Sequence, residues 1–364
     1  MDIVAAVIRE PSGKFLIEEL ELEEPRDDEV LVRIVGVGLC HTDLSCRDQM
    51  YPVPLPAVLG HEGAGVVERV GDKVTRVQPG DHVVMSYRSC GACRNCLAGD
   101  PSHCLRIFEY NFSGMRADGS CALRKEGEQV HSNFFGQSSF ATYALANEAN
   151  TVKVDKDLPL EILAPLGCGV QTGAGAVMNS LAAKPGSSIA IFGCGSVGLS
   201  AIMAAKVVGC TSIIAVDPIP ERLELAVSLG ATHIISPSKE DPVERILAIT
   251  EDGATYSLEC TALPSVFRQA VDSLGIGGVC GLVGAAPMGT EVALDMNSIM
   301  FGRTVKGVIV GESVPDLFIP ILIDLYRQGK FPIDKLVTFY PLAEIEKAVK
   351  DSEQGKVVKA VLLP

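Results

Sequence analysis

Four cysteines that lie close together are the first residues in the chain whose spacing points to chemistry. Cys90, Cys93, Cys96 and Cys104 follow the pattern C-x2-C-x2-C-x7-C. Four thiolates on so short a loop suit one tetrahedral Zn²⁺, which binds sulfur at about 2.3 Å. Two local disulfides or four buried thiols are the alternatives, and spacing this tight favours the metal. Because all four ligand positions would be closed, we predict a structural zinc lobe at about residues 90–104, with the chemistry elsewhere.

A glycine-rich motif, Gly-Cys-Gly-Ser-Val-Gly, lies between a predicted strand at 188–192 and a predicted helix at 196–208. G-x-G-x-x-G in this context is typical of dinucleotide-binding folds. Its first glycine makes a tight turn, its second lets the backbone approach a pyrophosphate, and its third lets the helix pack against the sheet. The helix N-terminus then offers free N–H groups to a phosphate. The predicted cofactor-binding residues of the loop are Gly193, Gly195, Ser196, Val197 and Gly198.

Asp217, at the end of the next predicted strand, indicates which dinucleotide binds. A carboxylate at this place accepts hydrogen bonds from both hydroxyls of the adenosine ribose and repels a 2′-phosphate. The sequence therefore predicts NAD rather than NADP, the alternative being that Asp217 is a solvated turn residue before Pro218. Arg222 either contacts the adenine or a phosphate, or lies on a solvated helix face.

The elements around these motifs predict two domains. As far as about Lys153, short β-rich runs alternate with glycine and proline, which indicates an irregular, mostly antiparallel β domain. After Pro165, apolar strands alternate with helical segments, which predicts a parallel, doubly wound sheet. The predicted strands of this part are 188–192, 212–216, 232–235, 255–259 and 279–283, and the predicted helices are 196–208, 220–229, 242–250 and 264–274. From about Val314 we expect two more helices and a last strand at 357–363.

Length, charge and composition limit the possible partners. A chain of 364 residues is long enough for two cores, and its formal charge is −14 without a basic run. Nucleic acid and anionic membranes are therefore poor partners, and a small or uncharged substrate fits better. The N-terminus lacks the form of a signal peptide, and we expect the apolar stretch 187–205 to be a buried strand and helix. With 12 cysteines and no export signal, we expect the protein in the cytoplasm.

Three further segments carry a resemblance to a known family. They are Cys40-His41-Thr42-Asp43, Gly60-His61-Glu62 with the glycines that follow it, and Gly167-Cys168-Gly169. With these motifs in this order, the chain resembles the zinc-containing medium-chain alcohol dehydrogenases over essentially its whole length. The resemblance implies an α/β protein in which a Rossmann doubly wound parallel sheet is joined to a β-rich, GroES-like catalytic domain. It places the catalytic domain at 1–168, the NAD-binding domain at 169–310 and a C-terminal return to the catalytic domain at 311–364.

The resemblance also implies a catalytic zinc. Cys40, His61 and Cys168 would bind this metal and leave its fourth position for water or a substrate oxygen. Two thiolates and one imidazole suit Zn²⁺, although only the resemblance places Cys168 near Cys40. Asp43 would orient the His61 ring, and Glu62 would lie behind the metal. A core histidine with its hydrogen bonds satisfied is the alternative for His61.

The family's proton route is matched only in part. A hydroxyl two residues after the first cysteine ligand takes the substrate proton in the family, and Thr42 has that place. The usual relay then continues to a histidine, but this chain has Ser45 there. A water chain, the cofactor ribose or His41 are the candidates for the last carrier. His41 and Lys359 also match positions where many members have a cation beside the cofactor pyrophosphate.

The closer resemblance is to the aryl-alcohol branch, of benzyl-alcohol dehydrogenase type, through the stretches 47–56, 134–143 and 165–176. It implies reversible oxidation of a primary aryl or allylic alcohol to the aldehyde, with NAD and two zinc ions per chain. Tyr51 would line the substrate pocket, the alternative being ordinary packing before Pro52. The alternative functions are a glutathione-dependent formaldehyde dehydrogenase and a non-catalytic relative.

Two expectations concern the rest of the chain. The cysteines outside the proposed metal sites are read as buried thiols; they are Cys46, Cys121, Cys194, Cys210, Cys260 and Cys280. The apolar run 299–301 follows the last clear strand, so we expect an unpaired apolar edge there. Such an edge invites association, and a two-fold pair is the commonest way to close it. The sequence therefore predicts a homodimer, with a homotetramer as the alternative.

Overall fold

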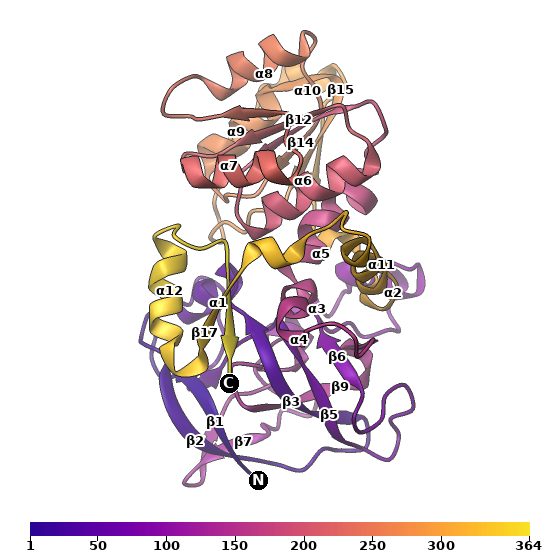
Figure 1. Ribbon diagram of the computed structural model, residues 1–364. Helices are drawn as coiled ribbons and strands as arrows, with labels where there is room; N and C mark the ends of the chain where they lie inside the picture. The colour runs from indigo at the N-terminus through magenta and orange to yellow at the C-terminus, as the bar shows by residue number, and fades with distance from the viewer. The chain divides into compact units, whose positions relative to one another are not determined.

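The computed structural model describes residues 1–364, and these group by their contacts into two compact units. Unit 1 consists of Met1–Cys168, Val314–Ile323 and Ile333–Pro364, and unit 2 consists of Gly169–Ser313 and Asp324–Pro332. The C-terminal part of the chain, which we expected to return to the first domain from residue 311, is therefore divided between the two units. Each unit has its own sheets (Figure 1).

Unit 1 contains two sheets in which nearly all neighbouring strands are antiparallel, as the β-rich pattern predicted. The first has the strand order β4-β1-β2-β7-β8. Its strands are Asp2–Ile8 (β1), Leu16–Leu22 (β2), Ala57–Val58 (β4), Leu123–Lys125 (β7) and Glu128–Val130 (β8). The second has the order β10-β6-β5-β3-β18-β17, with β9 paired to β3. Its strands are Glu29–Gly38 (β3), Gly63–Val70 (β5), His82–Met85 (β6), Tyr143–Asn147 (β9), Thr151–Val154 (β10), Val337–Pro341 (β17) and Lys359–Leu363 (β18).

Three strands of the second sheet end or begin at the residues that matter for function. β3 ends at Gly38, shortly before Cys40, and β5 begins just after Glu62. β18 pairs with β3 through Val361 and Gly38, which brings the start of β18 beside the end of β3. The sheet thus gathers residues from three distant parts of the chain at one place. The helices outside unit 2 are His41–Arg47 (α1), Arg94–Leu97 (α2), Ile107–Phe112 (α3), Leu160–Leu163 (α4) and Ile345–Glu353 (α12), and Pro315–Arg327 (α11) begins in unit 1.

Unit 2 is a parallel sheet with the strand order β13-β12-β11-β14-β15-β16, which confirms the doubly wound prediction. The strands are Ser188–Phe192 (β11), Ser212–Val216 (β12), His233–Ile235 (β13), Ala254–Glu259 (β14), Leu274–Leu282 (β15) and Thr304–Gly307 (β16). The main helices are Gly169–Gly175 (α5), Ser196–Val208 (α6), Pro220–Leu229 (α7), Pro242–Thr250 (α8), Pro264–Asp272 (α9) and Met296–Met300 (α10). Three of these begin with proline, whose missing N–H costs nothing in the first turn of a helix.

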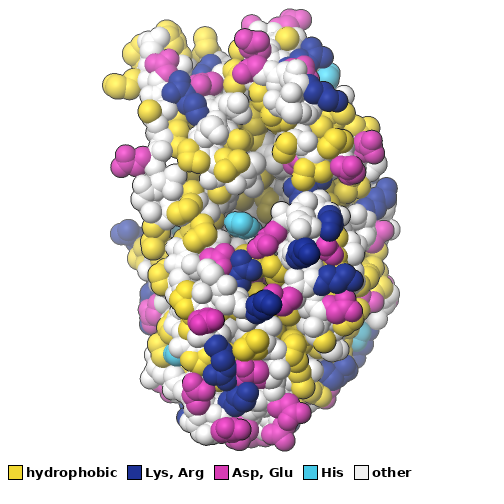
Figure 2. Space-filling model, turned by 90° about the vertical axis from the view of Figure 1, so that its left-hand side faces the viewer, with side chains coloured by type: hydrophobic (Ala, Val, Ile, Leu, Met, Phe, Trp, Pro, Cys, Tyr) yellow, Lys and Arg dark blue, Asp and Glu magenta, His cyan; other side chains and the backbone are white.

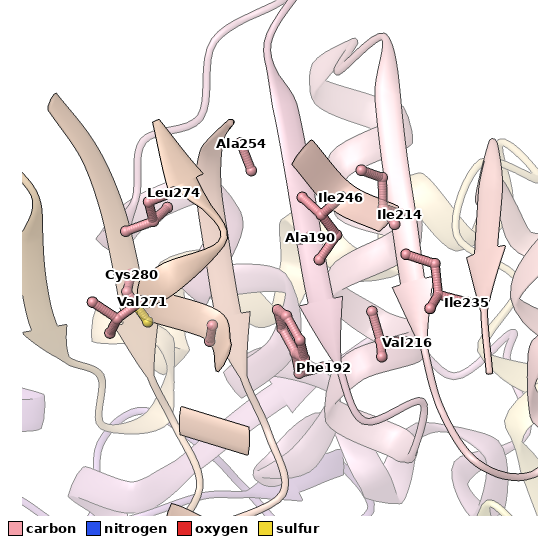
Figure 3. Packing of buried hydrophobic residues seen from close by; sticks show 11 residues of the cluster. Ala190, Phe192, Ile214, Val216, Ile235, Ile246, Ala254, Val271, Leu274 and Cys280 are labelled. Carbon is pink, nitrogen blue, oxygen red and sulfur yellow. The ribbon is translucent and has the colours of Figure 1, made fainter. Parts of the chain in front are cut away.

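The core of unit 2 explains why its strands read as continuous apolar runs. Ala190 and Phe192 on β11 and Ile214 and Val216 on β12 point to the same face, where they pack with Ile246 of α8 and with residues of α9 (Figure 3). The intervening residues of both strands are also buried, because α6 and α7 cover the other face (Figure 1). A parallel sheet covered on both faces requires apolar side chains at successive positions.

Two neighbouring predicted boundaries in unit 2 are wrong. The helix expected at 264–274 ends at Asp272, and the strand expected at 279–283 already begins at Leu274 as β15. Leu274 pairs with Ala254 across the sheet and is fully buried in its core. Burial of this leucine in the strand register therefore outweighs its helical periodicity.

The surface carries charges of both signs. On the face shown in Figure 2, lysine and arginine side chains are interspersed with aspartate and glutamate. Many of these charges form ion pairs, such as Arg9 with Glu18 at 2.7 Å and Lys125 with Glu18 at 2.9 Å. None of the helices is both long and apolar enough to cross a membrane.

Candidate active site

The four cysteines of the 90–104 segment converge on a common point. All four Sγ atoms lie within 4.8 Å of one another, with 3.5 Å between Cys93 and Cys96 and 3.9 Å between Cys90 and Cys96. These separations are much longer than a disulfide bond of about 2.05 Å. Four sulfurs placed tetrahedrally at about 2.3 Å from one zinc ion would be roughly 3.8 Å apart. The donor set therefore fits a closed zinc site and not two disulfides.

The backbone of this lobe stabilises thiolates. Cys90 N donates to Cys104 Sγ at 3.3 Å, and Cys93 N donates to Cys90 Sγ at 3.3 Å. The backbone N–H groups of Cys96 and Leu105 lower the pKa of Cys93 to about 6. Since the thiolate is the form that binds metal, Cys93 is prepared for a cation at neutral pH, whereas burial raises the pKa of Cys96 to about 12.

A second set of donors lies in unit 1 at the ends of β3 and β5. Ligand atoms of Cys40, His61, Glu62 and Cys168 all lie within 4.8 Å of one another. His61 is fully buried, and its Nε2 atom has no hydrogen-bond partner. A buried nitrogen without a partner is costly, and a metal at this point would satisfy it. The Cys168 thiol lowers the pKa of Cys40 well below its usual range by donating a hydrogen bond to it.

Asp43 ties the elements of this second set together. Its Oδ1 atom is 2.9 Å from His61 Nδ1 and accepts a hydrogen bond from Gly60 N at 3.1 Å. Its Oδ2 atom accepts from Cys40 N at 3.0 Å. Gly60 has φ +90, and a Cβ atom there would lie 2.5 Å from Phe140 N, so only glycine fits before His61. The carboxylate of Asp43 thus orients the His61 ring with Nε2 towards the sulfurs, in agreement with the expected role of Asp43.

Glu62 reaches the same cluster but is already paired. Lys359 Nζ lies 3.0 Å from Glu62 Oε1 and 2.9 Å from Oε2, and it also donates to Leu39 O at 3.0 Å. Burial alone would lower the pKa of Lys359, but the charges of Glu62 and Cys40 raise it well above its usual range. The resemblance implied a place beside the cofactor pyrophosphate for Lys359. In the structure its ammonium group pairs with Glu62, and only 3% of the residue is exposed.

Three side chains of α1 that were considered for proton transfer differ sharply in their surroundings. Thr42 Oγ1 lies 3.7 Å from Cys40 Sγ, next to the donor set. Ser45, at the place of the usual relay histidine, is 2% exposed, and its Oγ atom has no hydrogen-bond partner. His41 is exposed at the start of the helix. Of these three side chains, Thr42 is placed beside the donor set and His41 faces solvent.

Aromatic side chains extend from the His61 ring to Tyr51. Phe135 stacks on His61 with ring centroids 4.5 Å apart, and Phe112 contacts Phe135 at 5.2 Å. The ring centroid of Phe112 lies 6.1 Å from that of Tyr51 and 5.6 Å from that of Phe108. Aromatic residues make up only 5% of the chain, so their concentration beside one imidazole is a specific feature of this place.

The glycine-rich loop of unit 2 has the geometry of a phosphate-binding turn. Gly195 is the N-cap of α6, with Ser196, Val197 and Gly198 in its first turn. A Cβ atom on Gly198 would lie 1.8 Å from Gly193 O, which explains the last glycine of the motif. Asp217 is 2% exposed; it accepts hydrogen bonds from Cys194 N at 2.7 Å and from Ile219 N at 2.8 Å. The loop and Asp217 are therefore held together by hydrogen bonds, and Asp217 is not a solvated turn residue.

Arg222, in the first turn of α7, lies beside Asp217. Its Nη1 atom is 4.0 Å from Asp217 Oδ2, and its Nε atom is buried without a partner. The side chain is 21% exposed, so it does not lie on a freely solvated helix face.

Comparison with known proteins identifies the family of the chain. The family model of the alcohol dehydrogenase GroES-like domain matches residues 26–156, and that of the zinc-binding dehydrogenases matches residues 196–326. The chain belongs to the zinc-binding alcohol dehydrogenases. It is 48% identical to a geraniol dehydrogenase of Castellaniella defragrans over 99% of this chain and 97% of that protein. A class-3 alcohol dehydrogenase of Myxine glutinosa is more distant, at 36% identity over 98% and 96% of the two chains.

Solved structures agree with this assignment. The benzyl alcohol dehydrogenase of Acinetobacter calcoaceticus superposes with a TM-score of 0.96 at 51% identity, covering 100% of this chain and 99% of its own. An alcohol dehydrogenase zinc-binding domain protein of Burkholderia ambifaria superposes with a TM-score of 0.98 at 54% identity, with the same coverage. The predicted family and fold are confirmed, and the chain is an enzyme, a zinc-dependent alcohol oxidoreductase.

Sequence reasoning missed several residues that surround the metal donors of this alcohol dehydrogenase. Phe112 and Phe135 were not singled out, although the stretch 134–143 was noted for its resemblance to the aryl-alcohol branch. Gln137 was also missed: its side chain makes hydrogen bonds to His61 O and Gly63 N, on both sides of Glu62. A glutamine and two phenylalanines carry no spacing signature of their own. Only the fold brings them to His61.

Proposed function

We propose that the enzyme oxidises primary aryl and allylic alcohols to aldehydes, reversibly, with NAD as hydride acceptor. The observation that carries the substrate class is the aromatic wall formed by Tyr51, Phe112 and Phe135 beside His61. The names of the two relatives point the same way, since geraniol is an allylic alcohol and benzyl alcohol an aryl one. Aromatic faces pack well against a flat π-system, and such a π-system also stabilises the aldehyde product.

We further propose two zinc ions per chain, one for each donor set. Cys90, Cys93, Cys96 and Cys104 would hold the structural ion, and Cys40, His61 and Cys168 the catalytic one. When bound at the three-residue set, zinc supplies a Lewis acid that makes a hydroxyl group more acidic. Lys359 neutralises Glu62, which keeps this carboxylate from competing as a further ligand. Because both sets need reduced thiols, we place the enzyme in a reducing compartment such as the cytoplasm.

The residues of the chain then divide the remaining tasks. Asp43 Oδ1 accepts a hydrogen bond from Nδ1–H of His61, which leaves the Nε2 lone pair free for the metal. Thr42 Oγ1 accepts the alcohol proton and passes its own proton onward, with exposed His41 as the proposed route to solvent. The glycine loop and α6 bind the pyrophosphate, Asp217 the adenosine ribose, and Arg222 the adenine or a phosphate. The alcohol loses one proton and one hydride and becomes the aldehyde.

A matched panel of alcohols tests the substrate class. Benzyl alcohol and cyclohexylmethanol have similar size and differ mainly in the ring's π-system, and geraniol can be compared with its saturated analogue in the same way. We expect kcat/KM, followed by NADH absorbance, to be at least ~10-fold higher for each unsaturated member, a difference of about 1.4 kcal/mol. Equal values within both pairs would contradict the proposed substrate class.

Thr42→Ala is expected to lower kcat/KM for benzyl alcohol by at least tenfold, because positioned proton transfer contributes ~10²–10⁴ in rate. Thr42→Ser keeps the hydroxyl and should remain active. Ser45→Ala is the matched control on the same helix, since the Ser45 hydroxyl is buried without a partner, and its kcat/KM should stay near that of the wild type. Full activity in Thr42→Ala would remove Thr42 from the proton route.

Asp217→Ala is expected to lower kcat/KM for NAD by about 10- to 100-fold, since hydrogen bonds to a charged group are worth roughly 1.5–3 kcal/mol. The ratio of NAD use to NADP use should fall with it, because the negative charge that repels the 2′-phosphate is gone. Asp241→Ala removes an aspartate that caps α8 away from the loop, and it should leave the ratio unchanged. Steady-state kinetics with both cofactors measure the effect, and an unchanged ratio in Asp217→Ala would contradict the NAD assignment.

We also propose that the enzyme is a homodimer, with a homotetramer as the alternative. β16 is the edge strand of the unit 2 sheet, and large apolar side chains of β15 and of the segment 296–301 that precedes β16 are exposed. They include Ile276, Met296, Met300 and Phe301, exposed by 83%, 86%, 71% and 53%. An open strand edge with exposed apolar side chains favours pairing with a second copy.

A further inference from the structure

The segment 133–140, which precedes β9, has an unusual backbone. Asn133, Phe135 and Ser138 have φ values of 64°, 51° and 52°, in the left-handed region that residues other than glycine seldom adopt. Conformations of this kind persist only where the surroundings enforce them, and they cluster at functional sites. The contacts of this segment therefore indicate which part of the site holds these residues in the left-handed region.

The segment 133–140 lies along the stretch 58–63, which contains His61, and acts as its hydrogen-bond template. Four successive carbonyl oxygens, those of residues 58–61, each accept a hydrogen bond from this segment. In order, the donors are Ser138 Oγ (2.7 Å), Phe140 N (3.0 Å), Ser139 N (2.9 Å) and Gln137 Nε2 (2.9 Å). The carbonyl groups of residues 58–61 are thus held by this segment, between the end of β4 at Val58 and the start of β5 at Gly63.

Gln137 bonds the main chain on either side of Glu62, the residue that follows His61. Its Nε2 atom donates to His61 O at 2.9 Å and to Ser86 O at 3.2 Å. Its Oε1 atom accepts from Gly63 N at 3.0 Å and from Ser139 Oγ at 2.6 Å. The residue is 1% exposed, and its amide makes four hydrogen bonds. One side chain therefore fixes the main chain before and after Glu62.

The same segment also fixes the His61 ring. Phe135 stacks on the imidazole, with an interplanar angle of 30°, and Phe134 meets it edge-on with a centroid distance of 5.6 Å. With Nδ1 held by Asp43, the ring is restrained on its face, its edge and one nitrogen. Only Nε2 remains without a partner, and it is the atom that would bind the metal.

We infer that Gln137 is a positioning residue for the catalytic metal, acting through the backbone of His61. This inference rests on the proposed function in that it takes His61 as a zinc ligand. Gln137 touches neither substrate nor cofactor in this role; it holds the segment 58–63 on its template so that Nε2 of His61 stays aligned with the two cysteines. Partners that orient a metal ligand from outside typically contribute 10- to 100-fold in metal affinity.

The test uses Gln137→Met, which nearly keeps the side-chain volume and removes all four hydrogen bonds. Cobalt exchanged into the catalytic site of the intact enzyme reports ligand geometry through its visible absorption, and a chelator measures the rate of metal release. We expect an altered cobalt spectrum and release at least ~10-fold faster than in the wild type. Asn111→Leu is the matched control, because Asn111 is a fully buried amide that bonds Arg88 and Ile107 but not the segment around His61.

The outcomes separate positioning from ordinary stability. Urea unfolding of both variants measures their stability. If both substitutions lower the urea midpoint of unfolding alike, while Gln137→Met keeps the wild-type cobalt spectrum and release rate, the inference is overturned. If Gln137→Met does not fold, Ser139→Ala decides in the same way, since it removes only the 2.6 Å bond to the Gln137 amide. A wild-type enzyme that holds no cobalt in a His61-dependent site would contradict the proposed function instead.

Discussion

Replacing Cys168 by serine is expected to abolish alcohol oxidation while the protein remains folded. A serine hydroxyl is a poor substitute for a thiolate on zinc, so the open site loses one of its three ligands. Lewis-acid assistance of several kcal/mol corresponds to a loss of ~10³-fold or more in kcat/KM. Metal analysis should show the zinc content falling from two ions per chain to one, with the circular dichroism spectrum of the wild type retained.

Cys46→Ser is the matched control for this variant. Cys46 is fully buried on α1, close to Cys40, but it lies outside both donor sets. Burial raises the pKa of its thiol well above the usual range, so it is an inert apolar group. Cys46→Ser should therefore keep both zinc ions and most of the activity. Cys168→Ser with wild-type kcat/KM would remove Cys168 from the catalytic site.

The second large effect is expected at the other metal site, and it concerns stability rather than activity. Cys93→Ser should release the zinc of the 90–104 lobe, because the remaining three sulfurs no longer close a tetrahedral site. Metal binding and folding of such a loop are one process, so we expect the melting temperature to fall by ~10 °C. Differential scanning calorimetry measures the change, and limited proteolysis should cut the lobe first.

Cys121→Ser serves as control here, because Cys121 is a buried thiol whose Sγ atom donates to Gly114 O and belongs to neither metal set. Its melting temperature should change by much less. Both variants must be compared under reducing conditions, so that disulfide formation does not replace metal binding. An unchanged melting temperature in Cys93→Ser, together with two zinc ions per chain, would show that the lobe does not depend on metal.

The two short motifs were predictable because their geometry is local. The spacing of Cys90, Cys93, Cys96 and Cys104 limits where four sulfurs can go, and the structure brings them within 4.8 Å of one another. The glycine loop was predictable for the same reason, since a strand, a turn and a helix are consecutive in the chain. Short-range chemistry can be read from spacing alone.

The surroundings of His61 were not predictable in this way. Gln137 and Phe135 are separated from His61 by more than seventy residues, and the fold brings them together by pairing the segment 133–140 with 58–63. Lys359 lies still further away and reaches Glu62 because β18 pairs with β3. Sequence periodicity predicts the buried face of a strand or helix. It does not show which distant segment a residue contacts.

The most direct measurement of the central claim follows one hydrogen atom. Benzyl alcohol with both hydrogens of its CH₂OH carbon replaced by deuterium is incubated with the enzyme and NAD, and the products are analysed by mass spectrometry. Direct hydride transfer predicts NADH that carries deuterium and benzaldehyde that keeps the other deuterium. Benzaldehyde formed together with unlabelled NADH, or no turnover of NAD in the presence of zinc and benzyl alcohol, would contradict the account.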